Sequence, residues 1–135
     1  MNIVETDYWC LMLPPEWSAE REDGVVLITD QDGIGELAIS TLIFENATSN
    51  VASADIAREE SPEVTDWEPV SFGHFTGVVG QLREDAAVIT EWYLAHHTAL
   101  LYCTYACDEE DDGMDAAAVE EILGTLVPGD ALVEA

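Results

Sequence analysis

Residues 86–107, AAVITEWYLAHHTALLYCTYAC, carry the strongest structural signal in this 135-residue chain. The stretch predicts two strands, at 86–97 and 100–107, because it is rich in aromatic and β-branched residues. Apolar and polar positions do not alternate: Trp92 and Leu94 fall on one face of the first strand, and Tyr93 and Ala95 on the other. A sheet with one solvent-exposed face carries its apolar residues mainly on the other face. Because these strands carry apolar residues on both faces, we expect both faces to be covered.

The flanking segments predict the remaining elements of a single α+β domain over residues 1–135. A helix is expected after Asp112, because apolar residues recur at three-to-four-residue steps up to Leu126 before Pro128-Gly129. Further elements are expected at the following ranges: strands at 3–13, 25–29, 36–45, 68–75 and 77–82, and a helix at 51–60. The order β-β-β-α-β-β-β-β-α favours an α/β/α sandwich, with two helices covering one mostly antiparallel sheet of about six to seven strands.

The charge balance excludes two classes of partner. There are 29 acidic residues against three arginines, Arg21, Arg58 and Arg83, and no lysine, which gives a formal net charge of −26. So few cations cannot neutralise a row of phosphates, so binding to nucleic acid or to an anionic membrane is excluded. The 48% content of hydrophobic residues also separates this chain from a disordered acidic tail.

Cysteine usage and the N-terminal sequence indicate a cytoplasmic protein of bacterial type. Cys10, Cys103 and Cys107 are too few, and odd in number, for a disulfide framework, so three thiols are expected. The N-terminus has no basic region followed by an apolar one, and no window approaches the roughly 18 apolar residues of a membrane span.

The densest charge is the acidic run Asp108, Glu109, Glu110, Asp111 and Asp112. A solvated loop leading into the last helix, with Asp112 as its cap, is the first interpretation. A weak divalent-cation site or a contact for a basic partner is the alternative, since adjacent like charges repel unless a cation relieves them.

No motif predicts a metal, a cofactor or a catalytic activity. Asp30–Glu36 contains the Asp-x-Asp-Gly of a calcium loop, but the ligand positions on either side do not match, so we expect a hairpin turn there. The histidines and cysteines lack chelating spacing, and the chain has no Gly-x-Ser-x-Gly elbow and no phosphate loop with a lysine.

Two tryptophans stand in acidic, loop-like surroundings. Trp17 follows Pro14-Pro15-Glu16, and Trp67 lies between Asp66 and Glu68. Core packing is the first interpretation of both side chains. The second is an aromatic anchor for a basic protein partner, ringed by carboxylates.

Short phrases along most of the chain resemble small bacterial domains with the PsbP/Mog-like fold. These phrases are LPPEW (13–17), DGIGELAIS (32–40), SFGHFTG (71–77), WYL (92–94) with LLYCTY (100–105), and VEEILGTL (119–126). The resemblance implies an α/β/α sandwich, shared with the extrinsic PsbP protein of photosystem II and a Ran-binding nuclear-transport protein. It also implies binding rather than catalysis, because relatives include chaperones of type VI secretion effectors and resemble immunity proteins of toxin systems.

We therefore expect a non-enzymatic, acidic protein-binding domain, an immunity protein or effector chaperone whose partner is a basic toxin or secreted effector. The expected contacts are Trp17, Trp67 and residues 108–112. Two alternatives remain open: a small-ligand or calcium-binding domain, and a domain whose charge is an adaptation to a saline cytoplasm.

Overall fold

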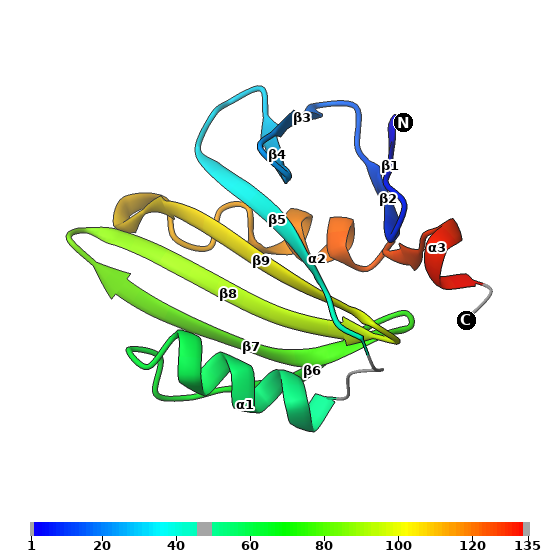
Figure 1. The fold of residues 1–135 in the computed structure, drawn as a ribbon. Helices are drawn as coiled ribbons and strands as arrows, with labels where there is room; N and C mark the ends of the chain where they lie inside the picture. Colours follow the sequence, from blue (N-terminus) through cyan, green and yellow to red (C-terminus); the bar gives the residue numbers. More distant parts are fainter. Residues whose placement is uncertain (1, 46–49, 134–135) are drawn as a thin grey trace.

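A seven-stranded antiparallel sheet forms the centre of the molecule (Figure 1). The computed structural model describes residues 2–45 and 50–133. In spatial order the strands are β3 (Trp17–Glu22), β4 (Val25–Asp30), β5 (Gly35–Ile43), β9 (Ala99–Asp108), β8 (Ala87–His96), β7 (Phe75–Glu84) and β6 (Glu68–Phe72). The strand pair β8–β9 lies within this sheet, with Trp92 opposite Cys103 and Tyr93 opposite Tyr102. The expected α+β class is confirmed.

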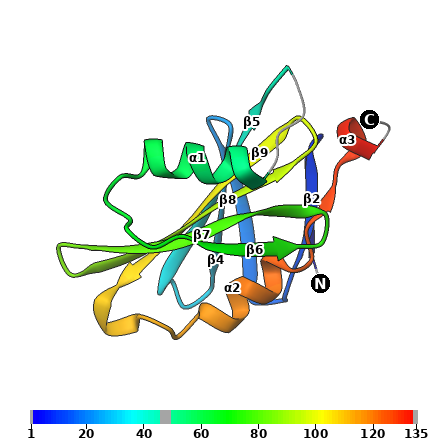
Figure 2. The ribbon, with the colours of Figure 1, turned by 90° about the horizontal axis from the view of Figure 1, so that it is seen from below.

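Both faces of β8 and β9 are covered, as their lack of alternation predicts. Trp92 and Leu94 belong to the larger hydrophobic core. Tyr93 and Ala95 belong to a second, smaller core on the other face, which includes Ala57 of the helix α1 (Asn50–Glu60). Figure 2, seen from the side of α1, shows this helix in front of the sheet, and Figure 1 shows α1 and α2 on opposite sides of it.

The first segment of the chain departs from the prediction of one strand over 3–13. It forms a hairpin of β1 (Asn2–Glu5) and β2 (Trp9–Leu13), which joins β10 (Val127–Pro128) in a separate three-stranded sheet. The Thr6 hydroxyl makes the reversal: its oxygen accepts a hydrogen bond from the Trp9 amide at 2.9 Å and its proton goes to the Trp9 carbonyl at 2.7 Å. Side-chain turns of this kind compete with an extended backbone.

The small sheet and the helix α2 together cover the face of the main sheet that carries the larger core. The helix α2 (Ala116–Leu123) buries Val119, Ile122 and Leu123 in the larger core, and β2 adds Trp9 and Leu11. Pro128, expected to stop the helix, lies instead in β10, and Gly124 follows the helical residues. A short helix α3 (Asp130–Val133) follows β10.

Of two expected turns, one is confirmed and one is displaced. The hairpin at 30–35 is confirmed, since β4 pairs antiparallel with β5 and the Gly33 amide donates to the Asp30 carboxylate at 3.0 Å. The break between the next two strands falls at Gly73-His74 rather than at Thr76, because Gly73 adopts a φ of +63°, which favours glycine. Phe75 therefore opens β7 and is fully buried.

The cover over the α1 face is uneven. The helix packs on β7 and β8, while β5 lies beyond β9 in the sheet. At its far end β5 leaves Leu42 and Ile43 about half exposed. A seven-stranded sheet is wider than one helix, so the strands beside α1 form the floor of an open hollow.

Candidate functional site

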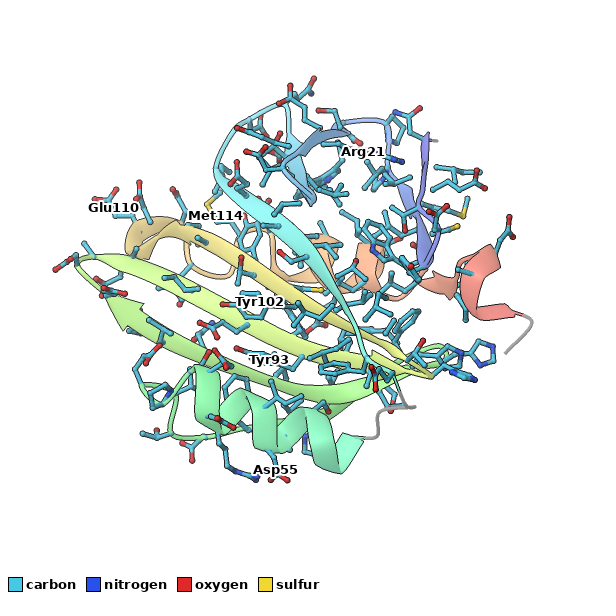
Figure 3. All side chains as sticks on the ribbon, viewed as in Figure 1. Arg21, Asp55, Tyr93, Tyr102, Glu110 and Met114 are labelled. Atoms are coloured by element: carbon cyan, nitrogen blue, oxygen red, sulfur yellow. The ribbon has the colours of Figure 1, made fainter. Side chains whose placement is uncertain are left out.

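The acidic run lies at the end of β9 and beyond it, on the outside of the molecule. Asp108 ends the strand, and Glu109–Asp111 form the 3₁₀ helix η1. In Figure 3, Glu110 points outward at this end of the sheet, far from Arg21 near β3 and from Asp55 on α1. The structure therefore brings the five acidic residues together in one segment, while the two tryptophans lie in other parts of the chain, Trp17 in β3 and Trp67 just before β6.

An arginine of the same chain already relieves part of this charge. The Arg83 guanidinium on β7 lies 3.0 Å from an Asp112 carboxylate oxygen and 3.8 Å from one of Glu109. Asp112 is not the cap of the last helix: Asp115 holds the N-cap position of α2, and its carboxylate accepts a 2.6 Å hydrogen bond from the Tyr105 hydroxyl. Asp108 and Glu110 stay exposed without an arginine in the described contacts.

Trp17 is not in a loop. It opens β3 opposite Asp30 of β4, and its residue is only 5% exposed within the larger core. The Pro14-Pro15 pair ends β2 and turns the chain directly into this strand, where the Trp17 amide donates to the Pro14 carbonyl. A side chain this deeply buried offers a partner almost no surface.

Trp67 is half-buried at the edge of the smaller core. Its ring packs edge-on against Tyr93, with the ring centroids 5.6 Å apart. Gly80 of β7 makes room for it, since a Cβ there would lie 2.9 Å from a Trp67 ring carbon. The indole Nε1 is buried and has no hydrogen-bond partner among the described residues. Trp67 thus packs on the sheet beside the hollow under α1.

That hollow is a pocket which the sequence analysis did not find. It has a volume of about 540 Å³ between α1 and the uncovered end of β5. Its residues come from four places in the chain: Ser40, Leu42 and Phe44 on and after β5, Ile56 and Glu60 on α1, Ser61 and Glu63 after that helix, and Glu91, Tyr93 and Tyr102 on β8 and β9. Figure 3 shows the two tyrosines next to each other between the sheet and α1.

Glu91 is the unusual residue of the pocket, because its residue is only 5% exposed. The Ser61 hydroxyl, also buried, donates to Glu91 Oε1 at 2.5 Å. The Ser61 and Tyr93 hydroxyl oxygens lie 2.8 Å apart. Since Ser61 has a single proton and gives it to Glu91, the Tyr93 hydroxyl is the donor to Ser61. A chain of hydrogen bonds therefore runs from Tyr93 through Ser61 to the Glu91 carboxyl.

The two tyrosines are held as neutral hydrogen-bond donors. Burial raises the pKa of Tyr93 above its usual value of 10.0, although the hydrogen bond with Ser61 lowers it in part. Burial also raises the pKa of Tyr102, and the charge of Glu91 and a hydrogen bond to its carboxyl raise it further. Both phenols therefore keep their protons at neutral pH, and Tyr93 donates its proton to Ser61.

No arginine reaches Glu91. Arg21 donates to the Glu5 carbonyl, Arg58 lies 3.4 Å from Asp55 on the exposed side of α1, and Arg83 pairs with Glu109 and Asp112. Among the described residues, the carboxyl of Glu91 thus has neutral donors but no cation, an arrangement that costs free energy in a folded protein. The sequence held one indication of this buried carboxyl: Glu91 is the charged residue on the face of β8 that also carries Tyr93 and Ala95.

The described part of the chain has thiols but no metal-binding group and no membrane-spanning helix. No group of three or more histidine, cysteine or acidic side chains there has the geometry to hold a metal ion. Cys10, Cys103 and Cys107 are free thiols, and burial raises the pKa of both Cys103 and Cys107. Within the same residues, no helix has the length and apolar character required to cross a bilayer.

Comparison with known proteins shows that the fold is shared with solved structures of low sequence identity. No family model matches this chain, and no curated protein matches it. A crystal structure of a protein from Bacteroides thetaiotaomicron is similar with a TM-score of 0.66 and 18% identity, over 89% of this chain and 44% of that one. This chain therefore spans less than half of that protein. The solution structure of the cyanobacterial PsbP protein CyanoP, from Synechocystis, matches with a TM-score of 0.47 and 11% identity, over 94% of this chain and 91% of that chain.

Proposed function

We propose that this chain is a non-enzymatic binding domain for a basic protein, acting in the cytoplasm as an immunity protein or chaperone of a toxin or secreted effector. The observation that carries the proposal is the engagement of all three arginines inside the chain. Arg21, Arg58 and Arg83 each contact a carbonyl or carboxylate of the same molecule. The arginines are thus engaged within the chain, and its net charge of −26 attracts ions or a basic partner from outside.

The acidic run supports the proposal in a limited way. Asp108 and Glu110 are exposed beside the two carboxylates that Arg83 neutralises. They are available to a partner, and complementary charge there would speed association and make binding weaken with salt. Trp67 is a less accessible contact, and Trp17 is left out of the proposed surface because of its burial.

The test is capture of the product of the neighbouring gene by the immobilised chain, repeated across a salt series. We expect binding of a basic protein that weakens steadily as salt is added. The double variant Asp108→Asn with Glu110→Gln keeps the pairs of Arg83 and should weaken binding more than the control, Glu20→Gln with Glu22→Gln on β3. Equal effects of the two variants would remove the acidic run from the interface, and binding that ignores salt would contradict the proposal.

The two alternatives predict different results. A calcium site in the acidic run would give heat on titration with millimolar calcium, although Arg83 already faces two of its carboxylates. A domain adapted to a saline cytoplasm would capture no basic protein and would be stabilised by potassium chloride in the same way whichever acidic pair is removed.

A further inference from the structure

The pocket under α1 combines an uncompensated carboxyl with free hydrogen-bonding capacity. A carboxylate offers about four lone-pair positions, and Ser61 uses one of them at Glu91. The Tyr93 and Tyr102 hydroxyl oxygens can also accept hydrogen bonds. The innermost part of the pocket thus presents several acceptors and lacks a positive group among the described residues.

The walls of the pocket are apolar and aromatic. Leu42 and Phe44 stand at the end of β5, are both exposed, and face Ile56 of α1 across the opening. The Tyr93 and Tyr102 rings lie 4.9 Å apart at the floor. Aromatic faces attract cations, and aliphatic walls favour methylene groups. A ligand that fits both surfaces carries a cation at the end of a short hydrocarbon chain.

We propose that this pocket binds a primary alkylammonium group, with Glu91 as its counter-charge and Leu42, Phe44 and Ile56 against its alkyl chain. Glu60 and Glu63 at the rim add negative charge on the path to the site. The proposal concerns a defined pocket and does not depend on the acidic run or on the proposed protein partner.

The geometry favours an ammonium over a guanidinium. A guanidinium binds a carboxylate best as a planar fork that uses both oxygens. At Glu91, Oε1 already accepts the short bond from Ser61, and the carboxyl is nearly buried. An ammonium is compact and can direct its three protons to separate acceptors, such as the carboxyl and the two tyrosine oxygens.

The experiment is a calorimetric titration of the full chain with n-butylammonium chloride at constant ionic strength, with n-butanol as the neutral analogue of the same shape. We expect one saturable site for the ammonium and binding at least about tenfold weaker for the alcohol, since hydrogen bonds to charged groups are the stronger ones. Methylammonium should bind more weakly than n-butylammonium, because it cannot reach the apolar walls.

The variant Glu91→Gln keeps the shape of the side chain but removes its charge and replaces one acceptor oxygen with a donor NH2 group. It should weaken n-butylammonium binding about tenfold or more. The matched control, Glu36→Gln, removes the same charge from an exposed position on β5 and should change the affinity by less than about threefold. If Glu91→Gln does not fold, the wild-type protein still provides the answer, because saturable shifts of the Tyr93 and Tyr102 ring resonances report binding directly.

Several results would overturn the proposal: equal affinity for n-butanol and n-butylammonium, an unchanged affinity in Glu91→Gln, or the absence of saturable binding. An alkylammonium group belongs either to a free amine or to a lysine side chain, so the titration is repeated with 1,4-diaminobutane and with N-acetyl-lysine methylamide. Tighter binding of the diamine assigns the pocket to free amines, and tighter binding of the lysine derivative to a side chain held on a polypeptide. Loss of amine binding in Glu91→Gln with unchanged capture of a basic protein would separate this site from the proposed function.

Discussion

Glu91 is a buried acidic side chain on a strand face that otherwise holds a smaller hydrophobic core. The described part of the chain buries three polar or charged residues, Ser53, Ser61 and Glu91, and two of them meet in this pocket. Burying a polar group destabilises a protein unless its hydrogen bonds are complete. Their meeting beside an open cavity is the observation that supports the binding site proposed above.

Ser61 links the phenol of Tyr93 to the carboxyl of Glu91, because its hydroxyl is a hydrogen-bond partner of both groups. Ser61→Ala should lower the free energy of unfolding by about 1–3 kcal/mol, because it leaves a buried donor and a buried acceptor with one partner fewer. The control Ser18→Ala, on an exposed position of the edge strand β3, should change it by less than about 0.5 kcal/mol. Urea unfolding measures both variants, and equal midpoints for the two would contradict this account.

His96 should make stability depend on pH. Burial lowers its pKa below 6.5, and the neighbouring His74 and His97 lower it further. The folded protein therefore binds this proton more weakly than the unfolded chain does. The stabilising contribution is complete above about pH 6.5 and is lost as the pH falls through the lowered pKa.

The variant His96→Gln tests this by thermal unfolding between about pH 7 and pH 5. Its melting temperature should fall less steeply with acidification than that of the wild type. The slope is the quantity to compare, because the variant also loses the contact of His96 with Phe75, at a centroid distance of 5.5 Å, at every pH. A slope as steep as in the wild type would show that other groups cause the dependence.

At the scale of elements, β7 and β8 approach each other closely at Gly77. A Cβ on Gly77 would lie 1.7 Å from the Tyr93 carbonyl oxygen, a backbone atom that cannot rotate away. Gly77→Ala should therefore push the two strands apart and lower the free energy of unfolding by about 1–3 kcal/mol. Because Tyr93 belongs to the pocket floor, the same variant should also weaken n-butylammonium binding.

A control for Gly77→Ala is Gly24→Ala, where a Cβ would meet nothing within 4 Å but φ is +81°. Backbone strain alone should then lower the free energy of unfolding by about 1–2 kcal/mol and leave ligand binding unchanged. Chemical denaturation and calorimetry of both variants separate the two effects. Unchanged ligand binding in Gly77→Ala would mean that the pocket floor does not follow the strand.

The elements were predictable where a local pattern decides them. The apolar run of β8 and β9, the turn at Asp30–Gly35 and the apolar stripe of α2 were read from neighbouring residues, and the structure agrees with them. Trp17 was expected in a loop because acidic residues surround it. It lies in β3 instead, because pairing with β4 buries its ring while the acidic side chains that follow point to solvent.

For the whole molecule, the net charge of −26 has no internal balance, so repulsion opposes folding. The Debye length shortens from about 30 Å at 0.01 M salt to about 8 Å at 0.15 M. The melting temperature should therefore rise with sodium chloride, most steeply over this range. The variant Glu20→Gln with Glu22→Gln lowers the charge and should show a smaller rise. A melting temperature independent of salt would contradict the role given to repulsion.

Periodicity, turn residues and charge are properties of neighbouring positions, so the α+β class, the two covered faces of the central strands and the acidic surface could be predicted without the structure. The separate sheet of residues 2–13 and the contact of Ser61 with Glu91, 30 positions away, became visible in the folded molecule alone. The reason is physical: a side chain's burial and partners depend on which element covers it. One helix, narrower than the sheet, covers β7 and β8 and leaves a pocket beside them.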